Sequence, residues 1–312
     1  MAASPRISAI ITAYNSAAYL RDSIESVLKQ SRPVDEILVV DDGSSDDTPN
    51  IAVAYANAGV KYIQQENQGP GAARNLGLRQ TNGEIIAFLD ADDIWLENKT
   101  RLQVDYLSNH PNVGVVSGPK IWWRIEEGNN RWIQQYGDIP ESRVTDELLI
   151  NNVIVNPSMA LIRRSVLDKA GNYNPDLRWG EDWELWIRIS NWTHFGFVDE
   201  PVIIYRAHSD SLTHQDPLKS VNCYLDISRN AIRTAKPAWL RPIFLAHAES
   251  KNYFLRADNA LKKLQPRKQQ IGYALAAFLF YPWDDPSLKF KTVVRTLVGD
   301  SFYQKLKHQL RK

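Results

Sequence analysis

The sequence predicts an α/β fold in which helices flank a mostly parallel sheet, with a helical region at the C-terminal end. Short apolar runs alternate with segments of helical periodicity through the first 117 residues. This alternation is typical of a parallel sheet with helices on both faces. Polar and acidic residues directly follow three of the apolar runs. Ligands of such sheets bind beyond the carboxyl ends of the strands, so these residues predict a binding site there.

The elements follow in order along the chain. Five strands are expected, each largely apolar because both faces of a parallel sheet are covered. They cover residues 7–13, 36–40, 60–64, 84–89 and 113–117. The helices between them cover residues 18–30, 45–56, 69–78 and 96–107. Beyond these we expect a hairpin over 122–136 that turns at Gly128, Asn129 and Asn130, a helix over 181–190, strands at 194–198 and 202–205, and helices from 217 onward.

Composition narrows the class of protein. The 312 residues are 44% apolar and 23% charged, as in an ordinary globular protein with a real core. The formal charge of +1 favours neither a nucleic acid nor an acidic partner. The one cysteine, Cys223, cannot form an internal disulfide and fits a reducing compartment. The sequence has no signal-peptide core and no apolar run of about 18 residues, so we expect a cytoplasmic protein.

The acidic loop Asp90-Ala91-Asp92-Asp93 follows the fourth predicted strand. Three carboxylates in four residues repel one another at a buried strand end, and a divalent cation removes that cost. Mg²⁺ and Mn²⁺ take one or two carboxylates and complete their shell with phosphate oxygens and water. The alternative is that the acids only cap the following helix.

Two further loops have the chemistry of a nucleotide site. Asp42, after the second strand, is able to accept the imide N–H of a uracil or thymine ring, and Tyr14 to lie against that base. The alternatives are a turn at Asp42 and a packing role for Tyr14. In the third loop Gly69 and Gly71 precede a helix whose N-terminus favours anions, and Arg74 on its first turn is able to reach a diphosphate.

These loops together resemble the inverting glycosyltransferases of family 2, which have the GT-A fold. The matching motifs are SAIITAYNSAAYL, ILVVDDGSSDDT, NQGPGAARNLGL, GEIIAFLDADD, NPSMALIRRSVL, WGEDWELWIRI and VIIYRAHSDSLT. The resemblance covers residues 7–213 and leaves the C-terminal tail uncovered. It implies a glycosyltransferase domain over 1–215, with a nucleotide-binding half at 1–117 and an acceptor half at 118–215, and a helical extension over 216–312.

The resemblance also implies residue roles. Asp182 is expected to be the catalytic base, although a carboxylate at this helix start could merely cap it. The metal ligands are expected to be Asp92 and Asp90, with a weaker match at His208. The donor site is expected to comprise Thr12, Ala13, Tyr14, Asn15, Asp42, Gly71, Arg74, Asp90 and Ala91.

The expected activity is an inverting transfer, dependent on Mn²⁺ or Mg²⁺, from a nucleotide-sugar, expected to be a UDP-sugar, to a hydroxyl of a glycan or lipid-linked acceptor. The expected setting is synthesis of a polysaccharide, glycolipid or other cell-envelope glycan. Two alternatives stay open: a non-catalytic binder of nucleotide-sugar or polysaccharide, and a nucleotidyltransferase.

Residues 286–312 interleave seven cations with apolar residues against one acid. They could lie on the inner face of an anionic membrane or form a solvated face.

Overall fold

The computed structural model describes residues 4–124, 130–134, 144–208, 217–262 and 267–280. The chain divides into two compact units. The first comprises Met1–Leu148 and Asn152–Ser209, and the second comprises Leu149–Asn151 and Asp210–Lys312.

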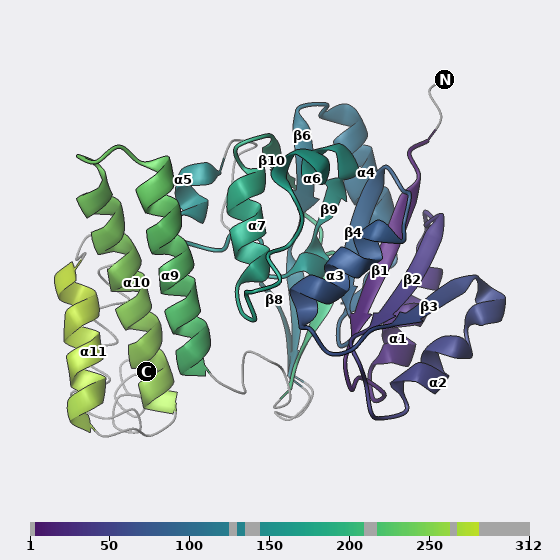
Figure 1. The fold of residues 1–312 in the computed structure, drawn as a ribbon, viewed down its shortest axis with the longest axis horizontal. Helices are drawn as coiled ribbons and strands as arrows, with labels where there is room; N and C mark the ends of the chain where they lie inside the picture. The colour runs from purple at the N-terminus through teal and green to yellow at the C-terminus, as the bar shows by residue number, and fades with distance from the viewer. Residues whose placement is uncertain (1–3, 125–129, 135–143, 209–216, 263–266, 281–312) are drawn as a thin grey trace, which may run out of the picture. The chain divides into compact units, whose positions relative to one another are not determined.

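A seven-stranded sheet forms the centre of the first unit, in the order β10-β6-β9-β4-β1-β2-β3 (Figure 1). Its strands are β1 (Ile7–Ala13), β2 (Glu36–Asp41), β3 (Val60–Gln64), β4 (Ile85–Asp90), β6 (Val113–Ser117), β9 (Leu161–Arg163) and β10 (His194–Phe197). All neighbours pair in parallel except β9, which runs antiparallel to both β4 and β6. The predicted fold class, a mostly parallel sheet flanked by helices, is confirmed.

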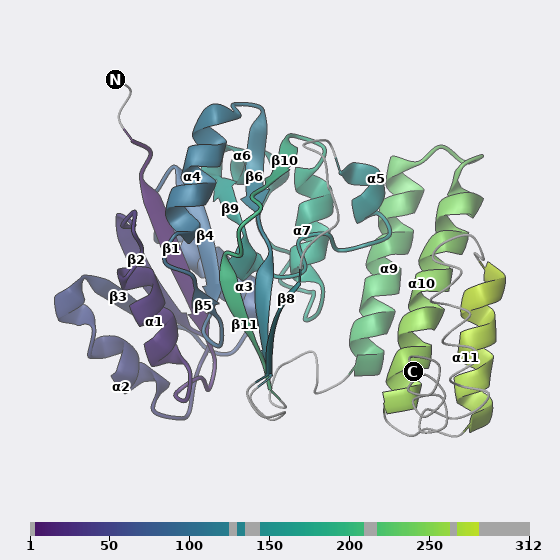
Figure 2. The same cartoon turned by 180° about the vertical axis from the view of Figure 1, so that it is seen from behind.

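Helices cover both faces of this sheet, which is why its central strands are apolar on both sides. On one face lie α1 (Leu20–Leu28), α2 (Thr48–Val53) and α4 (Lys99–Asn109), and on the other lies α3 (Pro70–Arg79) (Figures 1 and 2). Gly77 lets α3 approach closely, because a Cβ at this position would lie 2.4 Å from Ile10 Cγ2.

A second sheet of four strands has the order β5-β11-β7-β8. Its strands are β5 (Ile94–Trp95), β7 (Lys120–Arg124), β8 (Asn130–Gln134) and β11 (Ile203–Ala207). The antiparallel pairing of β7 with β8 matches the predicted hairpin. Two of its predicted turn residues, Gly128 and Asn129, lie outside the described residues, and the third, Asn130, is the first residue of β8 and not part of the turn. The sequence predicted neither β5 nor β9, because strands of two or three residues are too short to show periodicity.

The first unit also contains two short 3-10 turns and three further helices. They are the 3-10 turns η1 (Ala56–Ala58) and η2 (Pro157–Met159), and the helices α5 (Thr145–Leu148), α6 (Arg164–Ala170) and α7 (Glu181–Ile189).

The second unit is helical, with α9 (Pro217–Ala235), α10 (Arg241–Lys262) and α11 (Arg267–Phe280). Side chains bond its helices together: Asn252 Nδ2 donates to the Val221 carbonyl at 2.8 Å, and Ser250 Oγ to the Ala277 carbonyl at 2.7 Å. None of the helices that the structure describes is long and apolar enough to cross a membrane. The basic segment 286–312 lies outside the described residues.

We expect Gly77→Ala to destabilise the first unit by about 1–3 kcal/mol, because the added Cβ overlaps a strand side chain that has no room to move. Chemical denaturation measures this. The matched control is Gly272→Ala in α11, where nothing lies within 4 Å of the added Cβ. The control should stabilise its helix by about 0.5–1 kcal/mol through helix propensity. Equal effects at the two positions would contradict the close approach of α3.

Candidate functional site

The carboxyl ends of β1, β2 and β4 lie side by side in the sheet. Thr12 is in register with Asp90, and Ala13 with Asp41. The polar residues that follow the first, second and fourth predicted strands therefore leave the sheet at the same edge. The structure thus brings together the predicted site residues of the first, second and fourth strands.

The loop after β1 is tied to the loop after β2 by its own polar groups. Asn15 has a left-handed backbone with φ of 47°. Its N–H donates to Ser44 Oγ at 2.9 Å, and its side-chain oxygen accepts from the Ser45 N–H at 2.9 Å. The Ala13 carbonyl accepts from the Asp42 N–H. Tyr14 is left 51% exposed, so its ring is available to a ligand.

Asp42 is buried, and its carboxylate holds the loop that precedes α3. It accepts from Gln65 Nε2 at 2.7 Å and from the backbone N–H groups of Gln68 and Gly69 at 2.9 and 2.8 Å. A carboxylate has about four acceptor sites, and these hydrogen bonds occupy three of them. Beside it lies an open hollow of about 510 Å³. The hollow is lined by Gly43, Ser44, Gln64, Gln65, Glu66 and Asn67.

Arg74 is the most enclosed charge of the predicted site, at 3% exposed. Its two terminal nitrogens bond different carboxylates: Nη2 lies 2.7 Å from Asp90 Oδ1, and Nη1 lies 2.7 Å from Glu181 Oε1. Its guanidinium also lies 5.4 Å from the centre of the Tyr173 ring. Gly71, one turn earlier, lies close to the loop before α7: a Cβ added there would lie 3.3 Å from the Asn174 carbonyl oxygen. Arg74 therefore joins the end of β4 to the start of α7.

The carboxylates of the acidic loop differ in exposure. The side chains of Asp90 and Asp92 are 26% and 31% exposed. Asp90 Oδ1 also accepts from Thr12 Oγ1 at 3.2 Å, and Ala91 between the two is buried. Asp93 is buried, and burial together with the charges of Asp92 and Asp90 raises its pKa well above the ordinary value. Asp90 and Asp92 are therefore partly open to solvent, while Asp93 belongs to the core.

Asn156, which precedes η2, and Ser158 within η2 support this loop, and sequence reasoning gave them no role. Asn156 Nδ2 donates to Asp93 Oδ2 at 2.7 Å. Ser158 Oγ accepts from the Asp90 N–H at 3.0 Å. Both lie in a motif of the resemblance, NPSMALIRRSVL, so the signal was present in the sequence without its geometry. They are adjacent to the loop because β9, which follows η2, pairs with β4.

His208 lies against the acidic loop, with Nε2 3.0 Å from Asp92 Oδ2. Its ring packs on Tyr19, with 4.7 Å between the ring centres. β11, which ends just before His208, pairs with β5, which begins just after Asp93. This pairing brings His208 next to Asp92, two of the three predicted metal ligands.

The donor atoms at this point suit a divalent cation. Imidazole nitrogen together with carboxylate oxygen is a ligand pair used for first-row divalent metals. Within the part of the chain that the structure describes, no group of three or more His, Cys, Asp or Glu side chains is arranged to hold a metal ion. Asp92 and His208 are the pair that fits, with Asp90 next to them.

Asp182 lies in the first turn of α7, after Gly180 with φ of 73°. Its Oδ1 accepts from the adjacent Trp183 N–H at 2.7 Å, within the first turn, while the N-cap position itself is Gly180. Its Oδ2 accepts from Asn152 Nδ2 at 3.2 Å. Burial and the adjacent Glu181 carboxylate raise the pKa of Asp182 to about 7. A carboxyl group whose pKa lies near neutrality is suited to take up a proton at pH 7. Asp182 is therefore a candidate general base.

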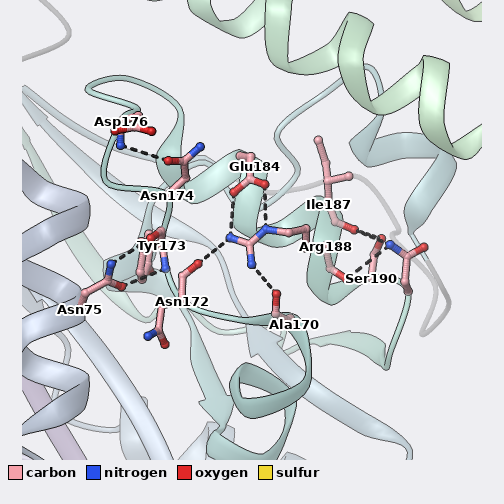
Figure 3. A network of polar contacts seen from close by, with 11 residues as sticks. Asn75, Ala170, Asn172, Tyr173, Asn174, Asp176, Glu184, Ile187, Arg188 and Ser190 are labelled. Atoms are coloured by element: carbon pink, nitrogen blue, oxygen red, sulfur yellow. Dashed lines mark hydrogen bonds and ion pairs between the residues drawn. The ribbon is translucent and has the colours of Figure 1, made fainter.

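The loop between α6 and α7 is held from two sides (Figure 3). From α3, Asn75 forms a pair of hydrogen bonds with the backbone of Tyr173, at 2.8 and 2.9 Å. From α7, Arg188 donates to the carbonyls of Ala170 and Asn172 and forms a two-pronged ion pair with Glu184. The start of α7 is therefore fixed relative to Arg74.

Comparison with known proteins assigns the chain to a family. The model of "Glycosyl transferase family 2" matches residues 8–171, more than half of the chain. The chain belongs to glycosyltransferase family 2 and is a glycosyltransferase. This confirms the resemblance seen in its motifs.

Two relatives illustrate the range of sequence identity and coverage. An uncharacterised glycosyltransferase of Rickettsia prowazekii is 30% identical over 68% of this chain and 67% of the relative. The putative teichuronic acid biosynthesis glycosyltransferase TuaG of Bacillus subtilis is 27% identical over 83% of this chain and 97% of the relative. Other Rickettsia glycosyltransferases are longer, and the chain spans 44% and 36% of two of them.

Solved structures show the same fold. S. aureus TarS 1–349 in complex with UDP-GlcNAc has a TM-score of 0.68 at 20% identity, over 98% of this chain and 91% of that one. A mannosyltransferase of Pyrobaculum calidifontis, in complex with GDP-Man and Mn²⁺, has a TM-score of 0.62 at 20% identity, over 95% and 86%. The fold is therefore GT-A, as predicted.

We expect Arg74→Gln to lower the free energy of unfolding by about 3–5 kcal/mol, because it leaves two carboxylates without their buried cation. The loss should be smaller at acidic pH, where protonation removes the uncompensated charge. Urea denaturation at pH 5 and pH 8 measures both effects. Arg79→Gln, at the exposed end of the same helix, is the matched control and should change stability by less than about 0.5 kcal/mol. A pH-independent loss would contradict the ion-pair origin.

Proposed function

We propose that this glycosyltransferase moves a sugar from a UDP-sugar to a hydroxyl of a glycan or lipid-linked acceptor, with inversion at the anomeric carbon and with Mn²⁺ or Mg²⁺. One observation carries the proposal: the continuous set of contacts from Thr12 through Asp90 and Arg74 to Glu181, the neighbour of Asp182. These contacts hold the acidic loop and the candidate base in one frame. The UDP-sugar complex of the TarS fold relative and the name of TuaG support the donor and a cell-envelope glycan as product.

Asp182 is the proposed general base. It removes the proton of the acceptor hydroxyl as that oxygen bonds to the anomeric carbon, while the bond from the sugar to the diphosphate breaks. Attack opposite the leaving group inverts the anomeric centre. A base whose pKa lies near neutrality is ionised for half or more of the time above pH 7 and still binds a proton strongly.

Asp92, Asp90 and His208 would hold the metal ion, which when bound neutralises charge on the diphosphate. Asp90 keeps its position because Arg74 and Thr12 bond one of its oxygens. The Mn²⁺ complex of the Pyrobaculum calidifontis mannosyltransferase, which has the same fold, supports this assignment. The donor contacts are proposed for Thr12, Ala13, Tyr14, Asn15, Asp42, Gly71, Arg74, Asp90 and Ala91.

A panel of nucleotide-sugars with Mn²⁺ or Mg²⁺, read by thermal shift and by mass spectrometry, tests the activity. One UDP-sugar should stabilise the protein and be slowly hydrolysed. Binding without turnover under any condition would favour a non-catalytic binder. Release of pyrophosphate from a nucleoside triphosphate would instead indicate a nucleotidyltransferase.

We expect Asp182→Asn to lower transfer by about 10²- to 10⁴-fold while the donor dissociation constant stays within a factor of about two, because the base acts on the acceptor proton. For the native enzyme, kcat/KM should rise with pH through an apparent pKa of about 7, since the base works only when deprotonated. Asp176→Asn, an exposed aspartate in the preceding loop, is the matched control. If Asp182→Asn weakened donor binding as much as it lowered transfer, Asp182 would not be the general base.

We expect Asp92→Asn to weaken donor binding by at least about tenfold when Mn²⁺ is present and to have little effect in EDTA, because the metal links the side chain to the diphosphate. Isothermal titration calorimetry with and without Mn²⁺ separates the two cases. Asp105→Asn, exposed on α4, serves as control. A defect of the same size in EDTA would contradict a metal-mediated role.

A further inference from the structure

The turn between α9 and α10 carries an unusual pair of exposed apolar side chains. Trp239 is 75% exposed, more than any other large hydrophobic residue that the structure describes, and Ile243 is 53% exposed. The turn lies at one end of the helical unit (Figures 1 and 2). Exposing an indole to water is unfavourable by the hydrophobic effect, so a contact that covers Trp239 would be favourable.

The turn is ordered by its own hydrogen bonds. The N–H groups of Leu240 and Arg241 donate to the Pro237 carbonyl at 3.0 and 3.3 Å, and Arg241 Nε donates to the Lys236 carbonyl at 2.9 Å. The Lys236 ammonium lies 4.4 Å from the centre of the Phe244 ring. These contacts fix the backbone on both sides of Trp239, so its exposure is built into the turn.

The charge around this turn has one sign. From residue 233 to residue 248 the sequence contains Arg233, Lys236 and Arg241 and no acidic residue. Arg233 is exposed on the last turn of α9. An indole between cations at the end of a helical hairpin is the chemistry that suits a bilayer interface, where the ring enters the headgroup layer and cations meet lipid phosphate.

We propose that residues 233–243, the α9–α10 tip, contact an anionic membrane surface through Trp239 and Ile243, with Arg233, Lys236 and Arg241 facing lipid phosphates. The contact is reversible, because a few apolar side chains and cations bind far more weakly than a spanning helix. This inference does not depend on the proposed sugar donor, metal or catalytic base.

Charge complementarity argues against two other ways to cover the tip. Residues 281–312 carry seven Lys or Arg against three Asp, so this segment would bring like charge to a basic turn. A second copy of the chain, packed tip to tip about a two-fold axis, would also oppose cation to cation. An anionic lipid surface would cover the apolar side chains and pair the cations with lipid phosphates.

Flotation of the full-length chain with phosphatidylcholine vesicles, with and without 30% phosphatidylglycerol, tests the proposal. The native protein should float with the anionic vesicles, less at high salt, and weakly or not at all with neutral ones. Trp239→Ala should lose most of the bound fraction. Arg233→Gln should weaken binding to anionic vesicles by about fivefold, the contribution expected of one cation near the surface.

The matched control is Trp192→Ala, because Trp192 is another exposed tryptophan, at 55%, in the other unit. It should float like the native protein. Circular dichroism melting establishes that each variant is folded. The proposal is overturned if the native chain does not bind anionic vesicles, if Trp239→Ala binds as tightly as native, or if Trp192→Ala loses binding equally. Donor hydrolysis by Trp239→Ala is measured alongside, so a failure of the tip is distinguished from a failure of the proposed activity.

Discussion

The buried guanidinium of Arg74 is the interaction on which the site depends. Removing a cation from water is costly, and only well-placed carboxylates offset that cost. Asp90 and Glu181 supply them from two elements that are 91 residues apart in the sequence. A movement of α3, of the β4 end or of the α7 start would therefore leave a buried charge without a partner. The charge balance holds the three elements together.

The same packing places the acidic side chains of the site in different environments. Asp90 and Asp92 stay partly open, whereas Asp93 is buried with a raised pKa. Asp182 is buried beside Glu181, and its pKa rises to about 7. Carboxyl groups of the same chemistry are thereby suited to different tasks, since desolvation and like charge favour the neutral form. The position of each in the fold, and not its residue type, decides which task it has.

The sequence predicted the sheet well and the partners of its loops poorly. Strands such as β3 and β6 were predicted with their observed bounds, because continuous apolar runs between turn residues define them. The short strands β5 and β9 were missed, although they bring His208, Asn156 and Ser158 to the acidic loop. The expectation that Arg74 reaches a diphosphate stays a prediction, and the structure shows what else holds that side chain. Contacts between distant segments leave no local pattern.

The sequence by itself determined the fold class, the family and the edge of the sheet where polar loops converge, because strand alternation and loop motifs are local properties of the chain. Only the tertiary structure decided that Arg74 lies between Asp90 and Glu181, that Asp93 is buried while Asp92 is open, and that Trp239 is exposed. Burial and ion pairing depend on which distant segments pack together. That packing sets the dielectric surroundings and the charges that each side chain meets.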